Sequence, residues 1–402
     1  MLVSIQMQKR APQVFALFNL GFRPFFLGGA VFALVSIFAW LGLINHWFAD
    51  QQAMTSTVVS LSQLHAHEML YGYTMAIIAG FLLTAVKNWT GIQTCHGWQL
   101  AIIFACWLAA RVLNLVPSSW MHAAVVFDAL FNVGLIAALF IPILRAKLWS
   151  QLAVVVKVLL LTIGNLLFYL QVFGVVAQGA LSSQILALVL VLSLIMMIGR
   201  RVVPFFIERG VGYAVKLKQN KWIDITIMLL FVAWLISLLF GLSNVASIIC
   251  AAIFLLNGYR LLDWHTKGIW QKPLLWSLYV SLWLINFGFL LSALQSLMNI
   301  PHTWLLHFFT IGGIGLITLA MMSRVSLGHT GRNIHQPPTL IQGAFMLIVL
   351  SLVFRFFLPV FAAQYYVWWV NFSGAFWIAA FALFVYAYAA ILIKPRVDGM
   401  DG

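Results

Sequence analysis

Long runs of apolar residues, separated by short polar stretches, dominate this chain. A helix needs about 20 predominantly apolar residues to cross the hydrocarbon core of a bilayer. Segments of this kind lie near residues 22–45, 65–86, 98–116, 121–144, 150–174, 183–199, 222–241, 244–261, 274–297, 303–323, 339–358 and 365–393. The pattern therefore predicts an all-α polytopic membrane protein, in which residues 1–402 form a single domain of twelve transmembrane helices.

The positive charges are distributed unevenly around these segments. Lys and Arg residues outside the segments fall in the N-terminus, in alternate loops and in the C-terminus. Because cytoplasmic loops are enriched in Lys and Arg, both termini are expected to be cytoplasmic. The chain is therefore expected to be a multi-pass protein of a cytoplasmic (inner) membrane. The formal net charge of +14 then describes a face that lies against anionic lipid, so the lipid bilayer, and not nucleic acid, is the expected partner.

The composition agrees with this interpretation and excludes one kind of metal site. Hydrophobic residues make up 64% of the chain and charged residues only 7%, which a water-soluble core would not require. The three cysteines, Cys95, Cys106 and Cys250, have no CxxC spacing. Neither a disulfide framework nor a thiolate metal site is therefore expected.

Histidines at the outer ends of two distant segments are the candidate metal ligands. His65, His67 and Glu68 begin the second segment, and His307 lies in the tenth. Both helices run from outside to inside, and His307 lies roughly 9 Å below the outer boundary at 1.5 Å per residue, which is a depth similar to that of His67. Imidazoles inside a bilayer usually have a function. Two imidazoles at one height suit the two axial positions of a heme, so His67 and His307 are the predicted ligands.

His65 and His67 require different roles, because residues i and i+2 of an α-helix point about 200° apart. We assign His67 to heme and leave His65 for copper or for a heme propionate, with His302 as a further copper ligand, since imidazole suits copper. The alternative is that His65 caps the helix and lies in the headgroup layer with Glu68.

Two arginines near the outer surface are candidates for binding heme propionates. Arg355 has no obvious carboxylate partner, which makes it the better candidate. Arg111 is the second candidate, although an ion pair with Asp128 is the preferred interpretation because a buried arginine needs an anionic partner. Below His307, the glycines Gly312, Gly313 and Gly315 indicate close helix packing more strongly than room for a macrocycle.

Several motifs together resemble the NnrS family, polytopic bacterial proteins that contain heme and copper and are linked to the nitric oxide response. They are Phe22-Arg-Pro-Phe-Phe, His65-Ala-His-Glu-Met-Leu-Tyr-Gly-Tyr, Gly80-Phe-Leu-Leu-Thr-Ala-Val, Asn88-Trp-Thr-Gly, Gly199-Arg-Arg-Val-Val-Pro-Phe-Phe and Met322-Ser-Arg-Val-Ser-Leu-Gly-His-Thr-Gly-Arg. The resemblance implies a heme, expected to be of b type, and copper. It also singles out residues to which we assign no chemistry, namely Arg23, Arg200, Arg201, Arg324, His329 and Arg332. For His329 the alternative is a ligand of a second metal centre on the inner side.

The family in turn resembles subunit I of the heme-copper oxidases, which has twelve helices and holds a low-spin heme between histidines of its second and tenth spans. Here, residues 183–199 contain no histidine, and Phe308 and Phe309 follow His307. The copper site and second heme of the oxidases are therefore not expected, and neither are oxygen reduction and proton pumping.

Three functions compete. The first is a heme protein that binds nitric oxide in the membrane and sequesters, transfers or reduces it. Reduction requires protons, for which Glu68 is the candidate donor, and an electron donor that the sequence does not identify. The second is a secondary transporter similar to the major facilitators, because the basic loop at residues 200–221 divides the helices into two sets of six. The third is an assembly partner of denitrification enzymes.

Overall fold

The computed structural model describes residues 15–47, 59–115 and 120–400, and within these ranges the chain is helical and contains no strand. Eleven helical stretches of the described chain are long and apolar enough to cross a membrane. The predicted third segment is also an apolar helix, but it is shorter, with 17 residues from Trp98 to Asn114. Each predicted segment thus contains a helix, which confirms the all-α polytopic fold.

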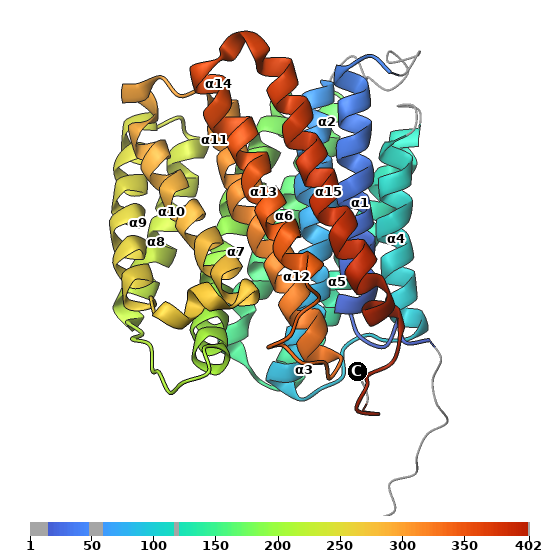
Figure 1. The fold of residues 1–402 in the computed structure, drawn as a ribbon. Helices are drawn as coiled ribbons and strands as arrows, with labels where there is room; N and C mark the ends of the chain where they lie inside the picture. The colour runs from blue at the N-terminus through green and yellow to red at the C-terminus, as the bar shows by residue number, and fades with distance from the viewer. Residues whose placement is uncertain (1–14, 48–58, 116–119, 401–402) are drawn as a thin grey trace, which may run out of the picture.

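The helices run side by side in one bundle (Figure 1). Their bounds are α1 (Phe22–Ile44), α2 (Leu61–His67), η2 (Glu68–Thr74), α3 (Met75–Thr90), α4 (Trp98–Asn114), α5 (Met121–Arg145), α6 (Leu152–Val172), α7 (Gly179–Gly210), α8 (Lys221–Leu239), α9 (Ser243–Asp263), α10 (Pro273–Met298), α11 (His302–His307), η6 (Phe308–Gly315), α12 (Leu316–His329), α13 (Leu340–Leu352), η7 (Val353–Phe357), α14 (Leu358–Phe361) and α15 (Tyr366–Ile393). Three of the spans are composite, because α2, η2 and α3 form one continuous helix, α11, η6 and α12 a second, and α13, η7 and α14 a third.

The first and last spans pack against each other, which brings the two ends of the fold together (Figure 1). The backbone N–H of Ala16 donates to the carbonyl of Ile393 at 2.8 Å. The fully buried Arg23 donates from Nη1 to the carbonyl oxygens of Leu392 and Lys394, each at 2.8 Å. Carbonyls in the last turn of a helix lack intrahelical partners, so Arg23 stabilises the end of α15.

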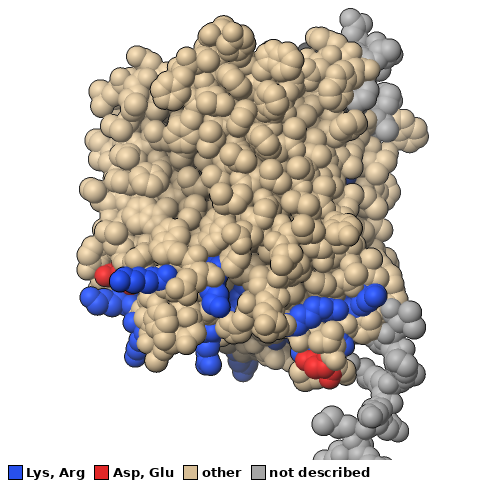
Figure 2. All heavy atoms as spheres, in the orientation of Figure 1, with Lys and Arg blue, Asp and Glu red and all other residues tan. Residues whose placement is uncertain are grey.

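Basic side chains gather at one end of the bundle. Figure 2 shows Lys and Arg as a band at the end where the C-terminus lies in Figure 1, whereas the opposite end of this face is free of them. The labels of α2, α11 and α14 lie toward that opposite end (Figure 1). His65, His67, His302 and His307, which lie on α2 and α11, are therefore toward the end remote from the basic band.

The glycines that follow His307 are packing positions. A Cβ atom added to Gly312 would lie 2.6 Å from a methyl group of Leu352, and one added to Gly313 would lie 2.6 Å from Ile285. At Gly315 the added atom would lie 2.6 Å from the ring of Trp377. The interpretation as close helix packing is confirmed.

Candidate functional site

The second and tenth spans bring two nearly parallel imidazoles close together near one end of the bundle. The ring centroids of His65 and His307 are 6.5 Å apart, and their planes differ by only 11°. Trp40 of α1 stacks on His65, with ring centroids 4.4 Å apart. The two spans that were expected to supply facing histidines do so, with His65 opposite His307.

The ring nitrogens of this pair are suited to a ligand. Nδ1 of His65 is buried and finds no hydrogen-bond partner among the described residues. Nδ1 of His307 donates to the carbonyl oxygen of Thr303 at 2.6 Å. Because a carbonyl only accepts, the proton of His307 lies on Nδ1, and Nε2 keeps its lone pair. Histidines that bind metals typically donate their other ring N–H to a carbonyl or a carboxylate in this way.

Arg355 lies beside the histidine pair. Its charge acts on both His65 and His307, and its side chain is 8% exposed. The guanidinium carbon is 5.3 Å from the centre of the Tyr366 ring, and Nη1 is buried without a hydrogen-bond partner in the described part of the chain. A buried cation with an unsatisfied nitrogen is a favourable site for an anionic group of a ligand.

His67 faces a different set of residues, as the i and i+2 geometry predicts. Its ring stacks on Phe168 with centroids 3.9 Å apart. Nδ1 is 2.8 Å from Oε1 of Glu68, and Nε2 is 2.7 Å from Oδ1 of Asn165. Both ring nitrogens of His67 are therefore hydrogen-bonded within the protein, whereas Nδ1 of His65 has no partner among the described residues and the hydrogen bond of His307 uses only its Nδ1.

The residues around His67 form a buried polar network from four spans, which we call the charge cluster. Arg111 donates from Nη1 to both carboxylate oxygens of Glu68 at 2.9 Å, and its Nη2 lies 2.5 Å from Oδ1 of Asp128. The other members connect these groups, and every member is 4% exposed or less. The cluster consists of His67, Glu68, Arg111, Asn114, Asp128, Asn165 and Tyr169. The preferred pairing of Arg111 with Asp128 is confirmed, and Glu68 is a second partner.

The hydrogen bonds also indicate how the cluster balances its charge. Nδ2 of Asn165 donates to Asp128 at 3.2 Å, so its Oδ1 faces His67 as an acceptor. Glu68 is an acceptor on the other side of the ring. His67 lies between these two acceptors, and Arg111 lies between the carboxylates of Glu68 and Asp128. Such compensation is what a low-dielectric interior requires of buried charges.

A glycine makes room for this arrangement. A Cβ atom added to Gly72 would lie 3.0 Å from Nη1 of Arg111 and 2.7 Å from the ring of Phe32. The carbonyl of Gly72 accepts a hydrogen bond from Nε1 of Trp107 at 3.0 Å. Gly72 therefore lets Arg111 pass close to the second span and reach Glu68.

Three π-helical segments adjoin the site. His67 immediately precedes η2, His307 immediately precedes η6, and Arg355 lies within η7. The described residues contain no π-helical segment besides these three. Such segments are uncommon and frequently occur at functional sites, so their positions support the His65, His307 and Arg355 cluster as the candidate site.

The basic residues at the other end of the bundle connect helices to one another. Arg200 of α7 and Arg260 of α9 both pair with Asp224 of α8, at 2.9 and 3.0 Å. Arg201 donates to Gln151 at 3.2 Å. These contacts give Arg200, Arg201 and Arg260 a structural role at this end of the bundle.

The remaining residues of the inner set lie at the end of α12. The guanidinium carbon of Arg324 is 4.7 Å from the centre of the Phe206 ring. His329 lies beside Phe22, with ring centroids 5.7 Å apart, and its carbonyl accepts from Arg396. Arg332, which follows α12, is partly buried.

No larger metal-binding group accompanies the histidine pair. Among the described residues, no group of three or more His, Cys, Asp or Glu side chains is arranged to hold a metal ion. His302, the additional copper candidate, is exposed at the start of α11. The site is therefore a two-imidazole site with a neighbouring arginine.

Sequence reasoning missed three members of the charge cluster. Asn114 lies three residues after Arg111, and Tyr169 lies four residues after Asn165. These spacings put each pair on one helix face. Polar residues that share a face of an apolar helix are a signal that could have identified the cluster.

Comparison with known proteins assigns the chain to a family. No curated protein matches it. The family model for NnrS, described as NnrS protein, matches residues 16–396, which include every helix from α1 to α15. Because the match spans nearly the whole chain, this protein belongs to the NnrS family.

Proposed function

We propose that this protein is a heme protein of the bacterial inner membrane that binds nitric oxide in the nitrosative stress response, and that His65 and His307 hold the heme iron. Membership of the NnrS family supports a role in the nitric oxide response. The observation that carries the assignment of the ligands is the nearly parallel pair of imidazoles with centroids 6.5 Å apart.

The spacing of the pair fits a single metal ion between the two rings. With metal–nitrogen bonds of about 2.0–2.1 Å, two imidazoles on opposite sides of one ion have ring centres roughly 6.3 Å apart. The unpartnered Nδ1 of His65 and the free lone pair on Nε2 of His307 are appropriate donors. His65 therefore takes the role that we first assigned to His67. Imidazole suits iron and copper alike, so copper is the second metal to be tested at this pair.

Arg355 is the residue we assign to a heme propionate. Its buried Nη1 finds no hydrogen-bond partner in the described part of the chain. Arg111 is engaged by Glu68 and Asp128, which leaves Arg355 as the stronger candidate of the two. A charge-assisted hydrogen bond from Arg to a carboxylate is stronger than a neutral one.

The heme would supply the iron coordination position at which nitric oxide binds. The protein side chains hold the two imidazoles differently. His307 is oriented by its hydrogen bond to Thr303, whereas Nδ1 of His65 finds no such bond among the described residues. His65 is therefore the ligand that we expect to give way to nitric oxide.

The charge cluster favours a protein that binds nitric oxide over one that reduces it. Glu68 was the candidate proton donor, but its carboxylate accepts from Arg111 and Asn114. Both oxygens of Glu68 are thus used as acceptors within the cluster, and we propose that the cluster fixes the second span beside the histidine pair.

The orientation in the membrane follows from the basic band. Cytoplasmic surfaces carry the excess of Lys and Arg, so we assign the end shown in Figure 2 with these residues to the cytoplasm. The histidine pair then lies toward the periplasmic side, and both termini are cytoplasmic.

The visible spectrum of the detergent-purified protein, with iron and copper analysis, tests the proposal. We expect a Soret band that sharpens on reduction with dithionite and shifts on addition of nitric oxide. A heme spectrum that does not respond to nitric oxide would contradict nitric oxide as the ligand, and would favour electron transfer as the function of the heme. A folded, colourless protein without metal would contradict the heme and favour the transporter.

A further inference from the structure

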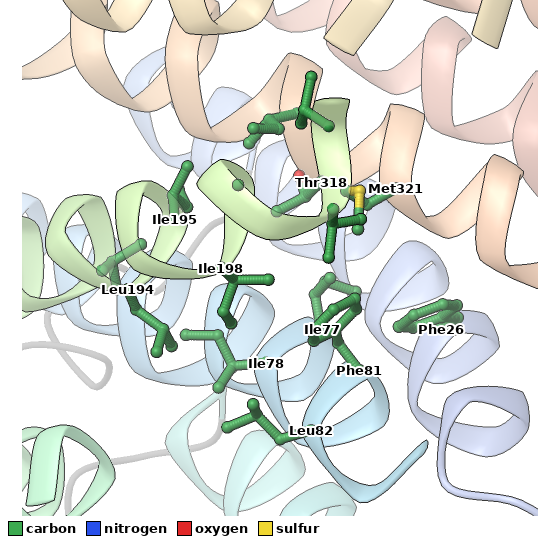
Figure 3. Close-up of a pocket in the computed structure, with 15 residues that line it drawn as sticks. Phe26, Ile77, Ile78, Phe81, Leu82, Leu194, Ile195, Ile198, Thr318 and Met321 are labelled. Atoms are coloured by element: carbon green, nitrogen blue, oxygen red, sulfur yellow. The ribbon is translucent and has the colours of Figure 1, made fainter. Parts of the chain in front are cut away.

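An apolar cavity of about 80 Å³ lies between α1, α3, α7 and α12 (Figure 3). The labelled side chains around it include Phe26 of α1, Ile77 and Phe81 of α3, and Ile198 of α7. Met321 of α12 completes the wall. The cavity therefore lies along the same two spans that carry His65 and His307.

The cavity offers water no hydrogen-bond partner. Among the side chains that line it, Thr318 is the polar one. Its hydroxyl donates to the carbonyl of Ile314 at 2.6 Å and lies 2.6 Å from the hydroxyl of Tyr73. An internal water typically needs two to four polar partners, and cavities lined by apolar groups stay dry and bind apolar molecules such as xenon. We therefore expect this cavity to contain no ordered water.

A glycine helps to leave the space open. A Cβ atom added to Gly199 would meet only Leu282, at 3.9 Å, although Gly199 is buried within α7. By contrast, a Cβ atom added to Gly312, Gly313 or Gly315 would lie 2.6 Å from a neighbouring side chain, so these positions have no such room. Gly199 is thus a position where a larger side chain has room to enter the cavity.

We propose that this cavity binds one small apolar gas molecule, and that the molecule is nitric oxide on its way from the bilayer to the histidine pair. The identity of the gas rests on the proposed function. Nitric oxide is an uncharged diatomic molecule that dissolves in apolar media. The volume of about 80 Å³ is several times the roughly 10–15 Å³ that a cavity needs to hold one water molecule, so a diatomic molecule fits. Roughly 18 Å of helix separates Ile77 from His65 at 1.5 Å per residue.

Xenon provides a test that does not depend on heme. Crystals of the full-length protein pressurised with xenon should show one anomalous peak in the cavity. The peak should be lost in Gly199→Val, because the added methyl groups take up the space. Gly343→Val is the matched control, since a Cβ atom there would also meet only a leucine methyl at 3.9 Å, but Gly343 is an exposed position on α13 that does not line the cavity. Nitric oxide added at the same xenon pressure should lower the xenon peak.

The outcomes separate this proposal from the proposed function. A cavity filled by ordered water or by a detergent chain, or a xenon peak unchanged in Gly199→Val, would overturn the gas site. A xenon peak that nitric oxide does not lower would overturn nitric oxide as its occupant. In protein that contains heme, Gly199→Val should also slow nitric oxide rebinding after flash photolysis several-fold, whereas Gly343→Val should not. A colourless protein whose cavity still binds xenon and nitric oxide would contradict the proposal that the protein holds heme, but it would support the proposal that the cavity binds a gas.

Discussion

Arg111 donates to both carboxylate oxygens of Glu68 at 2.9 Å, across the interface between the second and third spans. Both side chains are almost completely buried, at 1% and 3% exposed. Removing one partner of a buried ion pair leaves the other charge uncompensated. This pair therefore determines how the second span is positioned beside its neighbour.

The first prediction concerns this pair. Glu68→Gln keeps the size of the side chain but removes its charge, and should lower the free energy of unfolding by roughly 3–5 kcal/mol. Thermal unfolding in detergent measures the loss. Asp398→Asn, which removes an exposed partner of Arg396, is the control and should have little effect. An equal effect of the two substitutions would show that the buried pair does not stabilise the fold.

The second prediction distinguishes His65, His67 and His307. His307→Ala should abolish heme binding, because it removes the ligand that Thr303 orients. His65→Ala should leave heme held by His307 alone and speed nitric oxide binding. His67→Gln should retain the heme spectrum, since the amide can still hydrogen-bond within the charge cluster. Absorbance per protein and stopped-flow mixing with nitric oxide provide the measurements.

His122→Ala is the control for this series, because His122 is an exposed histidine stacked on Phe173 with centroids 4.6 Å apart. Its heme content should match that of the unsubstituted protein. Loss of heme in His67→Gln together with retention in His65→Ala would reverse our assignment and restore His67 as the ligand.

The third prediction concerns Arg355. A hydrogen bond to a charged group contributes about 1.5–3 kcal/mol, so Arg355→Ala should weaken heme retention roughly 10- to 100-fold. Transfer of heme to an acceptor protein measures the dissociation rate. Arg201→Ala, which removes an arginine at the opposite end of the bundle, is the matched control. Equal heme release from the two variants would exclude Arg355 as a propionate ligand.

The fourth prediction concerns packing below His307. Gly313→Ala would place a methyl group 2.6 Å from a side-chain carbon of Ile285, and overpacking of this kind costs about 1–3 kcal/mol. The melting temperature should fall, and the heme spectrum should broaden if η6 shifts. Gly343→Ala, with 3.9 Å of clearance, should melt like the unsubstituted protein. A stable Gly313→Ala variant would show that the neighbouring helix α10 yields easily.

The fold was predictable because the length of an apolar run is a local property of the sequence. The pairing of Arg111 with Asp128 was also predictable, because few charges lie inside the segments. Which of His65 and His67 lies beside His307 was not, since it depends on how the second span is rotated about its axis. That rotation is determined by contacts of His67 with Phe168 and Asn165, which lie about 100 residues away in the sequence.

The contact between the first and last spans has a consequence for biosynthesis. Arg23 in α1 reaches its carbonyl partners, Leu392 and Lys394, only when the end of α15 has been made. At about 5–20 residues per second, the first helix waits on the order of 20–70 s for them. During this time Arg23, which ends up fully buried, has not yet reached these two carbonyls. Synthesis of α15, and not insertion of the first helix, is therefore the event that completes this contact.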